Sequence, residues 1–422
     1  MLAAAGLPDA ARLATMPAMN VGLAQELVAG VGWNGGPDSF EAGAAAARAA
    51  LAQAGADAVV AVVYSTVLYD QEVVLRGVRE VLPDARIVGA STQDISRTGD
   101  VESSDRIVGV AILGGTEITA RTACATAVNG DPAAAARTLA EQLGPPPGAD
   151  APPLLLWYDP LTGINVDTLI AGLRAAGYTR ILGGGAGQPW GPIYRTYQYF
   201  EGKVMRDSAV ALRLDGDLEL IFDLTHGTDA LGLELVVTAA EGNVITTIDG
   251  RPALDVWREQ LGLGDDDTLD IEATAAWALG VTLPMEPAHD YEGPITRSVF
   301  GFRPETREVV LQAPIPAGTQ VQVCHRTPEA VFDRAAVMAT RLHARLAGRS
   351  PLLALSFECA ARARPFLGEE LTRREIGRMQ AILGEDLPWL GMYAWGEVAP
   401  VGAATYFHNY TFPLAVVCRR AR

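Results

Sequence analysis

The feature that most limits the possible folds is a pattern that occurs on both sides of a proline-rich segment. Residues 144–153 contain tandem prolines, and because proline disrupts both helices and sheet ladders, this segment is expected to be a linker. A strand–helix–strand–strand order is expected before it at residues 58–63, 72–81, 87–92 and 107–113, and after it at 154–157, 166–175, 181–186 and 208–214.

The match extends to short runs of residues. The run Leu-Arg-Gly-Val-Arg at 75–79 corresponds to Ile-Ala-Gly-Leu-Arg at 170–174, and Arg-Ile-Val-Gly at 86–89 corresponds to Arg-Ile-Leu-Gly at 180–183. A repeat of about 95 residues is too long for a solenoid. We therefore expect an internal duplication that gives two related α/β halves, with parallel strand pairing in each half.

The pattern changes near residue 231, where a second domain is expected to begin. A hairpin at 233–238 and 243–248 and a helix at 254–261 come first. Strands at 298–302 and 308–311 and a helix at 328–346 follow, and then a strand at 352–357, a helix at 371–383 and strands at 390–395, 405–407 and 414–417. The prediction is an α/β protein with a duplicated domain at 1–228 (halves at about 25–143 and 154–228) and a mixed-sheet α/β domain at 229–422.

Composition excludes several classes of function. The chain has 33 Lys plus Arg against 50 Asp plus Glu, a net charge of −17 that disfavours binding to nucleic acid or to anionic membrane surfaces. No run of about 18 apolar residues is present, so we expect no membrane insertion. Four scattered cysteines without Cys-x-x-Cys spacing argue against a zinc site or a disulfide scaffold, and a cytoplasmic location is expected.

Three polar clusters interrupt apolar runs near the end of the chain, at residues 356–362, 391–397 and 407–411. Each follows or ends a predicted strand, so a sheet could direct their side chains into one shared pocket, and clefts between domains are common ligand sites. The predicted ligand-binding residues from these clusters are Arg362, Tyr393, Glu397, His408, Asn409 and Thr411.

The first domain offers a second group of candidates. Gly183, Gly184 and Gly185 follow a strand and could let backbone N–H groups approach an anion, with Ser91 and Thr92 facing them across a cleft. The alternative is that the glycine turn is a bulge or a tight packing contact between the two halves.

Taken in order, the three C-terminal clusters are similar to the signature of the C-terminal FIST domain, and residues 87–92, 182–187 and the turn at 225–227 resemble the FIST N domain. The resemblance implies a small-ligand sensor in signal transduction, with amino acids among the suggested ligands. It implies a histidine kinase or a cyclic-dinucleotide enzyme as the partner. Some relatives are haem proteins that sense nitric oxide, for which His408 or His226 would be the candidate iron ligand.

A cysteine-dependent enzyme is a separate hypothesis, with Cys359 as nucleophile, His408 as base and Glu397 as the group that orients the base. Each residue also has a structural alternative. Cys359 could be a small buried residue, Arg362 could pair with Glu397 or Glu370, and His408 could be a core histidine bonded to the backbone or to Glu397.

Overall fold

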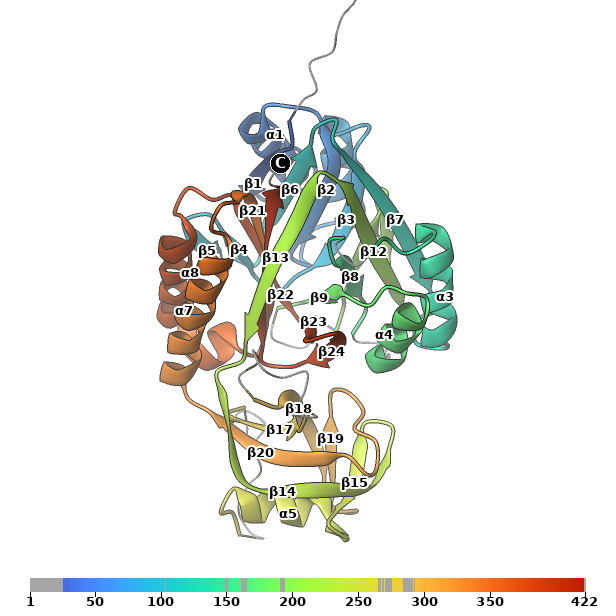
Figure 1. Ribbon diagram of the computed structural model, residues 1–422, viewed down its shortest axis with the longest axis vertical. Helices are drawn as coiled ribbons and strands as arrows, with labels where there is room; N and C mark the ends of the chain where they lie inside the picture. Colours follow the sequence, from blue (N-terminus) through green and yellow to red (C-terminus); the bar gives the residue numbers. More distant parts are fainter. Residues whose placement is uncertain are drawn as a thin grey trace, which may run out of the picture.

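The computed structural model describes residues 26–420, apart from 103, 149–150, 161–164, 190–193, 265–266, 268, 270–274, 284–290 and 292. Over these residues the strands form three six-stranded sheets and one seven-stranded sheet. The three six-stranded sheets make up a body whose helices lie on the outside, with α7 and α8 on one side and α3 and α4 on the other (Figure 1).

The body consists of three units with the same element order: strand, helix, strand, helix, strand, hairpin, strand. The first unit contains β1 (Val28–Asn34), α1 (Ser39–Ala54), β2 (Ala58–Ser65), α2 (Gln71–Val81), β3 (Arg86–Ser91), β4 (Ile95–Arg97), β5 (Asp100–Glu102) and β6 (Val108–Gly114). The second contains β7 (Ile118–Thr126), α3 (Pro132–Leu143), β8 (Leu154–Tyr158), α4 (Val166–Ala175), β9 (Ile181–Gly185), β10 (Gln198–Phe200), β11 (Lys203–Met205) and β12 (Ser208–Gly216).

The third unit has the same order but includes a large insertion after its first strand. It contains β13 (Leu218–Thr225), α7 (Pro328–Arg345), β21 (Ser350–Cys359), α8 (Gly368–Leu383), β22 (Trp389–Ala394), β23 (Glu397–Val401), β24 (Ala404–His408) and β25 (Phe412–Arg419), with a π-helical turn at Ala363–Leu367 before α8. Strand β13 pairs with β25 near the end of the chain, so this sheet crosses the domain boundary predicted at residue 228.

Strand pairing repeats in the three units as well. The second and third strands of each unit are parallel (β2 with β3, β8 with β9, β21 with β22), as predicted for the first two units. The last strand of each unit lies antiparallel between its first and second strands. The hairpin of each unit joins the sheet of another: β10 pairs with β3, β23 with β9, and β4 with β22. The units are therefore interlocked in a cycle.

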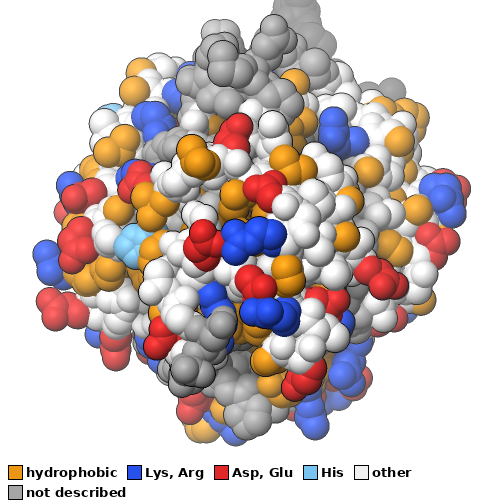
Figure 2. Space-filling model, turned by 90° about the horizontal axis from the view of Figure 1, so that it is seen from below, with side chains coloured by type: hydrophobic (Ala, Val, Ile, Leu, Met, Phe, Trp, Pro, Cys, Tyr) orange, Lys and Arg blue, Asp and Glu red, His pale blue; other side chains and the backbone are white. Residues whose placement is uncertain are grey.

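The insertion forms a small β-barrel, seen below the body in Figure 1. It contains β14 (Thr228–Glu241), β15 (Val244–Ile248), β16 (Arg251–Pro252), α5 (Ala253–Gln260), β17 (Trp277–Val281), β18 (Ile295–Arg303), β19 (Glu308–Leu311) and β20 (Gln320–Arg326). An additional β14–β15 pairing closes the sheet on itself. Viewed from this side, the surface carries interspersed acidic and basic side chains (Figure 2).

The centre of the body is a core shared by all three units. Tyr64, Trp157 and Phe357 occupy the same register position on β2, β8 and β21, one residue after the pairs that these strands form with Gly89, Gly183 and Gly391. The Trp157 indole N–H donates to the Tyr64 hydroxyl (3.3 Å), and the Trp157 and Phe357 rings lie 6.3 Å apart. Equivalent positions therefore pack around one centre, which fits the predicted duplication. An evolutionary duplication itself stays a prediction.

A glycine occurs in both of the matching runs, 75–79 and 170–174, and in the first run helix packing requires it. A Cβ on Gly77 would lie 2.1 Å from the backbone oxygen of Phe40, so α1 and α2 can approach closely only because this side chain is absent. Gly377, in the middle of α8, has nothing within 4 Å of its Cβ position.

These two helical glycines give a matched test. Gly77→Ala should lower the free energy of unfolding by about 1–3 kcal/mol through overpacking. Gly377→Ala should raise it by up to about 1 kcal/mol, because alanine favours the helix and meets no neighbour. Urea unfolding of the two variants measures both changes, and destabilisation of equal size in both would contradict the close helix contact.

Among the described residues, no helix combines the length and the apolar character that a membrane span requires.

Candidate functional site

The carboxyl ends of the third strands of the three units meet at one place. Three equivalent backbone hydrogen bonds connect them: Gly187 N to Ser91 O (2.8 Å), Trp395 N to Gly185 O (3.0 Å) and Gln93 N to Tyr393 O (3.5 Å). In parallel sheets, ligands bind beyond the carboxyl ends of the strands. These three hydrogen-bonded strand ends form a closed ring, and the side chains that follow it are the first candidates for a site.

The predicted cleft between Ser91–Thr92 and the glycine turn is instead a packed contact. The Ser91 hydroxyl donates to Gly187 O (2.8 Å), and Thr92 accepts a hydrogen bond from Tyr393 N (2.9 Å). A Cβ on Gly183, Gly184 or Gly185 would lie 1.8 Å, 2.6 Å or 2.5 Å from its nearest neighbour. These residues join the three units, in line with the packing alternative.

Arg362 is held in a buried ionic cluster of the third unit. Its guanidinium donates to both oxygens of Glu375 (2.6 and 2.7 Å) and to Glu358 (3.1 Å), and all three side chains are fully buried. Its partners are therefore neither Glu397 nor Glu370. Burial and the neighbouring Glu375 raise the pKa of Glu358 well above its ordinary value. Burial by itself would lower the pKa of Arg362, but Glu375 and Glu358 raise it.

Tyr393 lies beside this cluster, because it pairs in register with Glu358 on the adjacent strand. Burial and the Glu358 carboxyl raise the pKa of Tyr393 well above its ordinary value. Arg362 and Tyr393 thus belong to the interior of the third unit.

Glu397 begins β23 and is also fully buried, but it has no ion-pair partner among the described residues. Its Oε2 accepts from the backbone N–H (3.2 Å) and the hydroxyl (2.9 Å) of Thr411, while Oε1 has no hydrogen-bond partner in the described part of the chain. Burial raises the pKa of Glu397 to about 8, although the Thr411 bonds oppose the shift. Burial and Glu397 in turn raise the pKa of the Cys359 thiol.

Arg326, at the end of β20, was not predicted from the sequence as a site residue. Its guanidinium is stacked between the rings of Tyr410 (3.7 Å) and Phe366 (4.0 Å), and the side chain is 1% exposed. Nε donates to Ala275 O (2.9 Å) and Nη2 to Ala361 O (3.1 Å), whereas Nη1 has no hydrogen-bond partner among the described residues. Burial lowers the pKa of Arg326 to about 10, so it remains charged at neutral pH.

Tyr410, which stacks on Arg326, and the preceding Asn409 connect the barrel to the body. Tyr410 has a left-handed backbone (φ 62°), which is strained for a residue with a side chain, and its hydroxyl is 2.8 Å from that of Ser298. Asn409 accepts from Ser298 N (2.9 Å) and donates to Gln312 (2.5 Å). Both residues therefore fix the junction between the barrel and the body.

His408 and His226 are buried in their neutral forms, since burial lowers the pKa of each imidazole to about 3. His408 contacts Ala399 O through Nε2 (3.1 Å) and the Tyr291 hydroxyl through Nδ1 (3.4 Å). His226 accepts from Thr228 N at Nδ1 (2.9 Å), and its ring lies 5.3 Å from that of Tyr291. His226 Nε2 lacks a partner among the described residues.

This arrangement does not fit the haem hypothesis. Both ring nitrogens of His408 are engaged, and the His226 ring is fully buried against Tyr291 and close to the Cβ position of Gly293 (3.7 Å). An iron ligand needs an imidazole nitrogen facing an open slot. Among the described residues, no group of three His, Cys, Asp or Glu side chains could hold a metal ion.

The structure does not assemble the predicted catalytic triad either. Cys359 and Glu397 lie together, and Glu397 pairs with His408 across strands β23 and β24, but no side-chain hydrogen bond between described residues joins the His408 imidazole to either of them. A nucleophilic cysteine needs a lowered thiol pKa, and that of Cys359 is raised. Cys359 instead packs with Cys324 and Tyr410, as the structural alternative predicted.

Two family models match consecutive parts of this chain. The FIST N domain model matches residues 58–251 and the FIST C domain model matches residues 253–400. The uncharacterized protein Mb0898c of Mycobacterium bovis is 26% identical over 215 residues, which cover 50% of this chain and 54% of that protein. The uncharacterized protein MT0656 of Mycobacterium tuberculosis is 27% identical over 215 residues, with the same coverage. The chain thus spans about half the length of the curated relatives it matches.

A cyanuric acid hydrolase from A. caulinodans shares 10% sequence identity, with coverage of 94% of this chain and 100% of that chain. Its TM-score of 0.33 is too low to support an argument about fold or function. FIST domains are generally sensory domains of signal transduction that bind small ligands. Because the two family models together extend from residue 58 to residue 400, this chain belongs to the FIST family.

Proposed function

We propose that this protein is a sensor that binds a small α-amino acid at the junction between the barrel and the body, with Arg326 and Glu397 as the recognition pair. The observation that carries the proposal is that both side chains are buried and keep one polar atom each, Nη1 and Oε1, without a partner among the described residues. Buried polar groups are nearly always hydrogen-bonded, so such a pair favours a site that a ligand completes.

The chemistry of the two groups suits a zwitterion. The unpartnered Nη1 of Arg326 can donate charge-assisted hydrogen bonds to a carboxylate, and the rings of Tyr410 and Phe366 keep the guanidinium in place. A ligand ammonium group next to Glu397 would lower the raised pKa of its carboxyl and form an ion pair with it. Arg362, which was predicted from the sequence as a ligand-binding residue, is already bound by two glutamates.

The position of the site suggests how binding could be transmitted. Arg326 belongs to the barrel and Glu397 to the body, so a ligand held by both would favour one arrangement of the two parts over others. A separate partner, a histidine kinase or a cyclic-dinucleotide enzyme, would respond to that change. The proposed compartment is the cytoplasm, supported by four cysteines that are free among the described residues.

A thermal-shift screen of the single amino acids, followed by calorimetric titration of those that stabilise the protein, tests the proposal. At least one should bind the wild type, and Arg326→Gln should weaken that binding by about 10–100-fold, since it removes a charge-assisted pair. Arg326→Lys keeps the charge but not the planar fork, and it should show an intermediate loss.

Arg303→Gln is the matched control, because Arg303 also lies on the barrel but its side chain is 56% exposed. This variant should bind as the wild type does. The proposal is wrong if no amino acid binds, or if Arg326→Gln and Arg303→Gln bind equally well.

A further inference from the structure

A cavity lies at the opposite edge of the body from the Arg326 site, where the parallel strands begin. It has a volume of about 590 Å³ and is lined by Ala151, Pro152, Arg180, Glu219, Leu220, Ile221, Ala347, Gly348, Arg349 and Arg420. Residues 151–152 lead into β8, Arg180 into β9 and residues 347–349 into β21. The amino ends of these strands lie at the opposite edge of the sheets from the ring that connects the carboxyl ends. This cavity is therefore separate from the Arg326 site.

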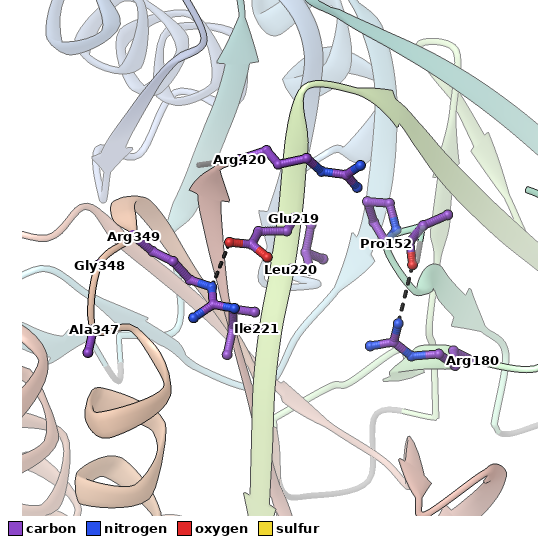
Figure 3. Close-up of a pocket in the computed structure, with 10 residues that line it drawn as sticks. Pro152, Arg180, Glu219, Leu220, Ile221, Ala347, Gly348, Arg349 and Arg420 are labelled. Atoms are coloured by element: carbon purple, nitrogen blue, oxygen red, sulfur yellow. Dashed lines mark hydrogen bonds and ion pairs between the residues drawn. The ribbon is translucent and has the colours of Figure 1, made fainter. Parts of the chain in front are cut away.

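We propose that this cavity binds a small phosphomonoester. Its lining contains three arginines and one glutamate, a local excess of positive charge in a chain whose net charge is −17. Figure 3 shows the guanidinium groups of Arg180, Arg349 and Arg420 on different sides of the β13 segment at 219–221. Arginine is well suited to phosphate recognition, because its planar fork binds two phosphate oxygens at once.

The arginines come from two units and are oriented by neighbours. Arg349 donates to Glu219 (2.6 Å) and to Arg345 O (2.7 Å), which holds it at the cavity wall beside the end of α7. Arg180 donates to Ala151 O (3.3 Å) and lies over the Phe222 ring (5.5 Å). A dianion between them would therefore also link the second unit to the third.

The size and the remaining lining indicate the rest of the ligand. Small-molecule sites have volumes of about 300–1,000 Å³ and combine apolar walls with a few polar groups. Pro152, Leu220 and Ile221 supply an apolar wall beside the arginines. A phosphate ester with a flat or apolar body fits this lining better than inorganic phosphate.

Calorimetric titration at low salt with adenosine monophosphate, inorganic pyrophosphate and adenosine as probes tests the assignment. Adenosine monophosphate should bind saturably and adenosine should not, because the phosphate supplies the charge. Arg180→Gln and Arg420→Gln should each weaken binding by about tenfold. The exposed Arg137→Gln on α3 (side chain 67% exposed) is the control for a lost positive charge and should bind as the wild type does.

The inference is overturned if adenosine monophosphate does not bind, or if the pocket variants and Arg137→Gln bind it equally. Saturable binding of pyrophosphate alone would also overturn it, since the site would then recognise an inorganic anion and not an ester. Arg326→Gln should leave this binding unchanged, so failure of the amino-acid site and failure of the phosphomonoester site give different results.

Discussion

Arg362→Met should lower the free energy of unfolding by about 3–5 kcal/mol, because breaking a buried ion pair leaves uncompensated charge in the interior. Arg362 holds Glu375 through both carboxylate oxygens and also contacts Glu358, and none of the three side chains is exposed. Without the guanidinium, the two buried carboxyl groups could avoid an unpaired negative charge only by taking up protons. Urea unfolding at neutral pH measures the change.

Two variants show whether the loss comes from the unpaired carboxyls. Arg374→Met removes an arginine of α8 whose pair with Glu370 is exposed (60% and 86%), and it should change stability by less than about 0.5 kcal/mol. Combining Arg362→Met with Glu358→Gln and Glu375→Gln should recover a large part of the loss. If Arg362→Met alone is as stable as Arg374→Met, the ionic cluster does not hold this core together.

Glu397→Gln should make the protein more stable than the wild type at pH 8.5, by about 3–5 kcal/mol, with little difference at pH 4.5. The pKa of Glu397 is raised from 4.5 to about 8 by burial. Between pH 4.5 and pH 8 the Glu397 carboxyl loses its proton in the unfolded state but keeps it in the folded state. The wild type therefore loses stability as the pH rises from 4.5 to 8. Glutamine keeps the hydrogen-bond acceptor for Thr411 but has no proton to lose.

The quantity to measure is the difference in unfolding free energy between Glu397→Gln and the wild type at pH 4.5, 6.5 and 8.5. Other titrating groups, such as Asp94 with its pKa raised to about 6 by burial, are common to both proteins and cancel in this difference. Glu370→Gln, at an 86% exposed side chain, is the control for removal of a carboxylate. A difference that stays constant with pH would contradict a buried, protonated Glu397.

Much of the secondary structure could be predicted from local sequence patterns. Helix α4 and strand β19 have the predicted bounds, and helix α7 begins at the predicted residue, where Thr327 caps it by accepting from Ala330 N (3.1 Å). The parallel pairing of β8 with β9 also follows from their strand–helix–strand order. The alanine-rich helix α1 was missed, because small side chains give almost no contrast between a buried and an exposed face.

The arrangement of the units could not be predicted, because each hairpin pairs with a strand far away in the sequence. Strand β4 pairs with β22 and strand β10 with β3, and sequence periodicity contains no information about such partners. The third unit was hidden for a related reason. The barrel separates β13 from α7, so the order that is visible twice before residue 228 is interrupted on its third occurrence.

The structure brings together only some of the predicted site residues. Glu397 and Thr411 are hydrogen-bonded to each other near the junction, whereas Arg362 and Tyr393 face the interior of the third unit. Arg326 was missed because the residues around it show only a strand end before a helix cap. The signal that could have identified it, an arginine flanked by two aromatic rings with one unpartnered donor, exists only in three dimensions.

The most direct test of a ligand site at the junction is a crystal structure of the full chain grown with a mixture of the twenty amino acids. The expected result is density for one bound molecule with its carboxylate on Arg326 Nη1 and its ammonium on Glu397 Oε1. Density showing these two atoms bonded only to water or to the protein's own residues would contradict the proposed function.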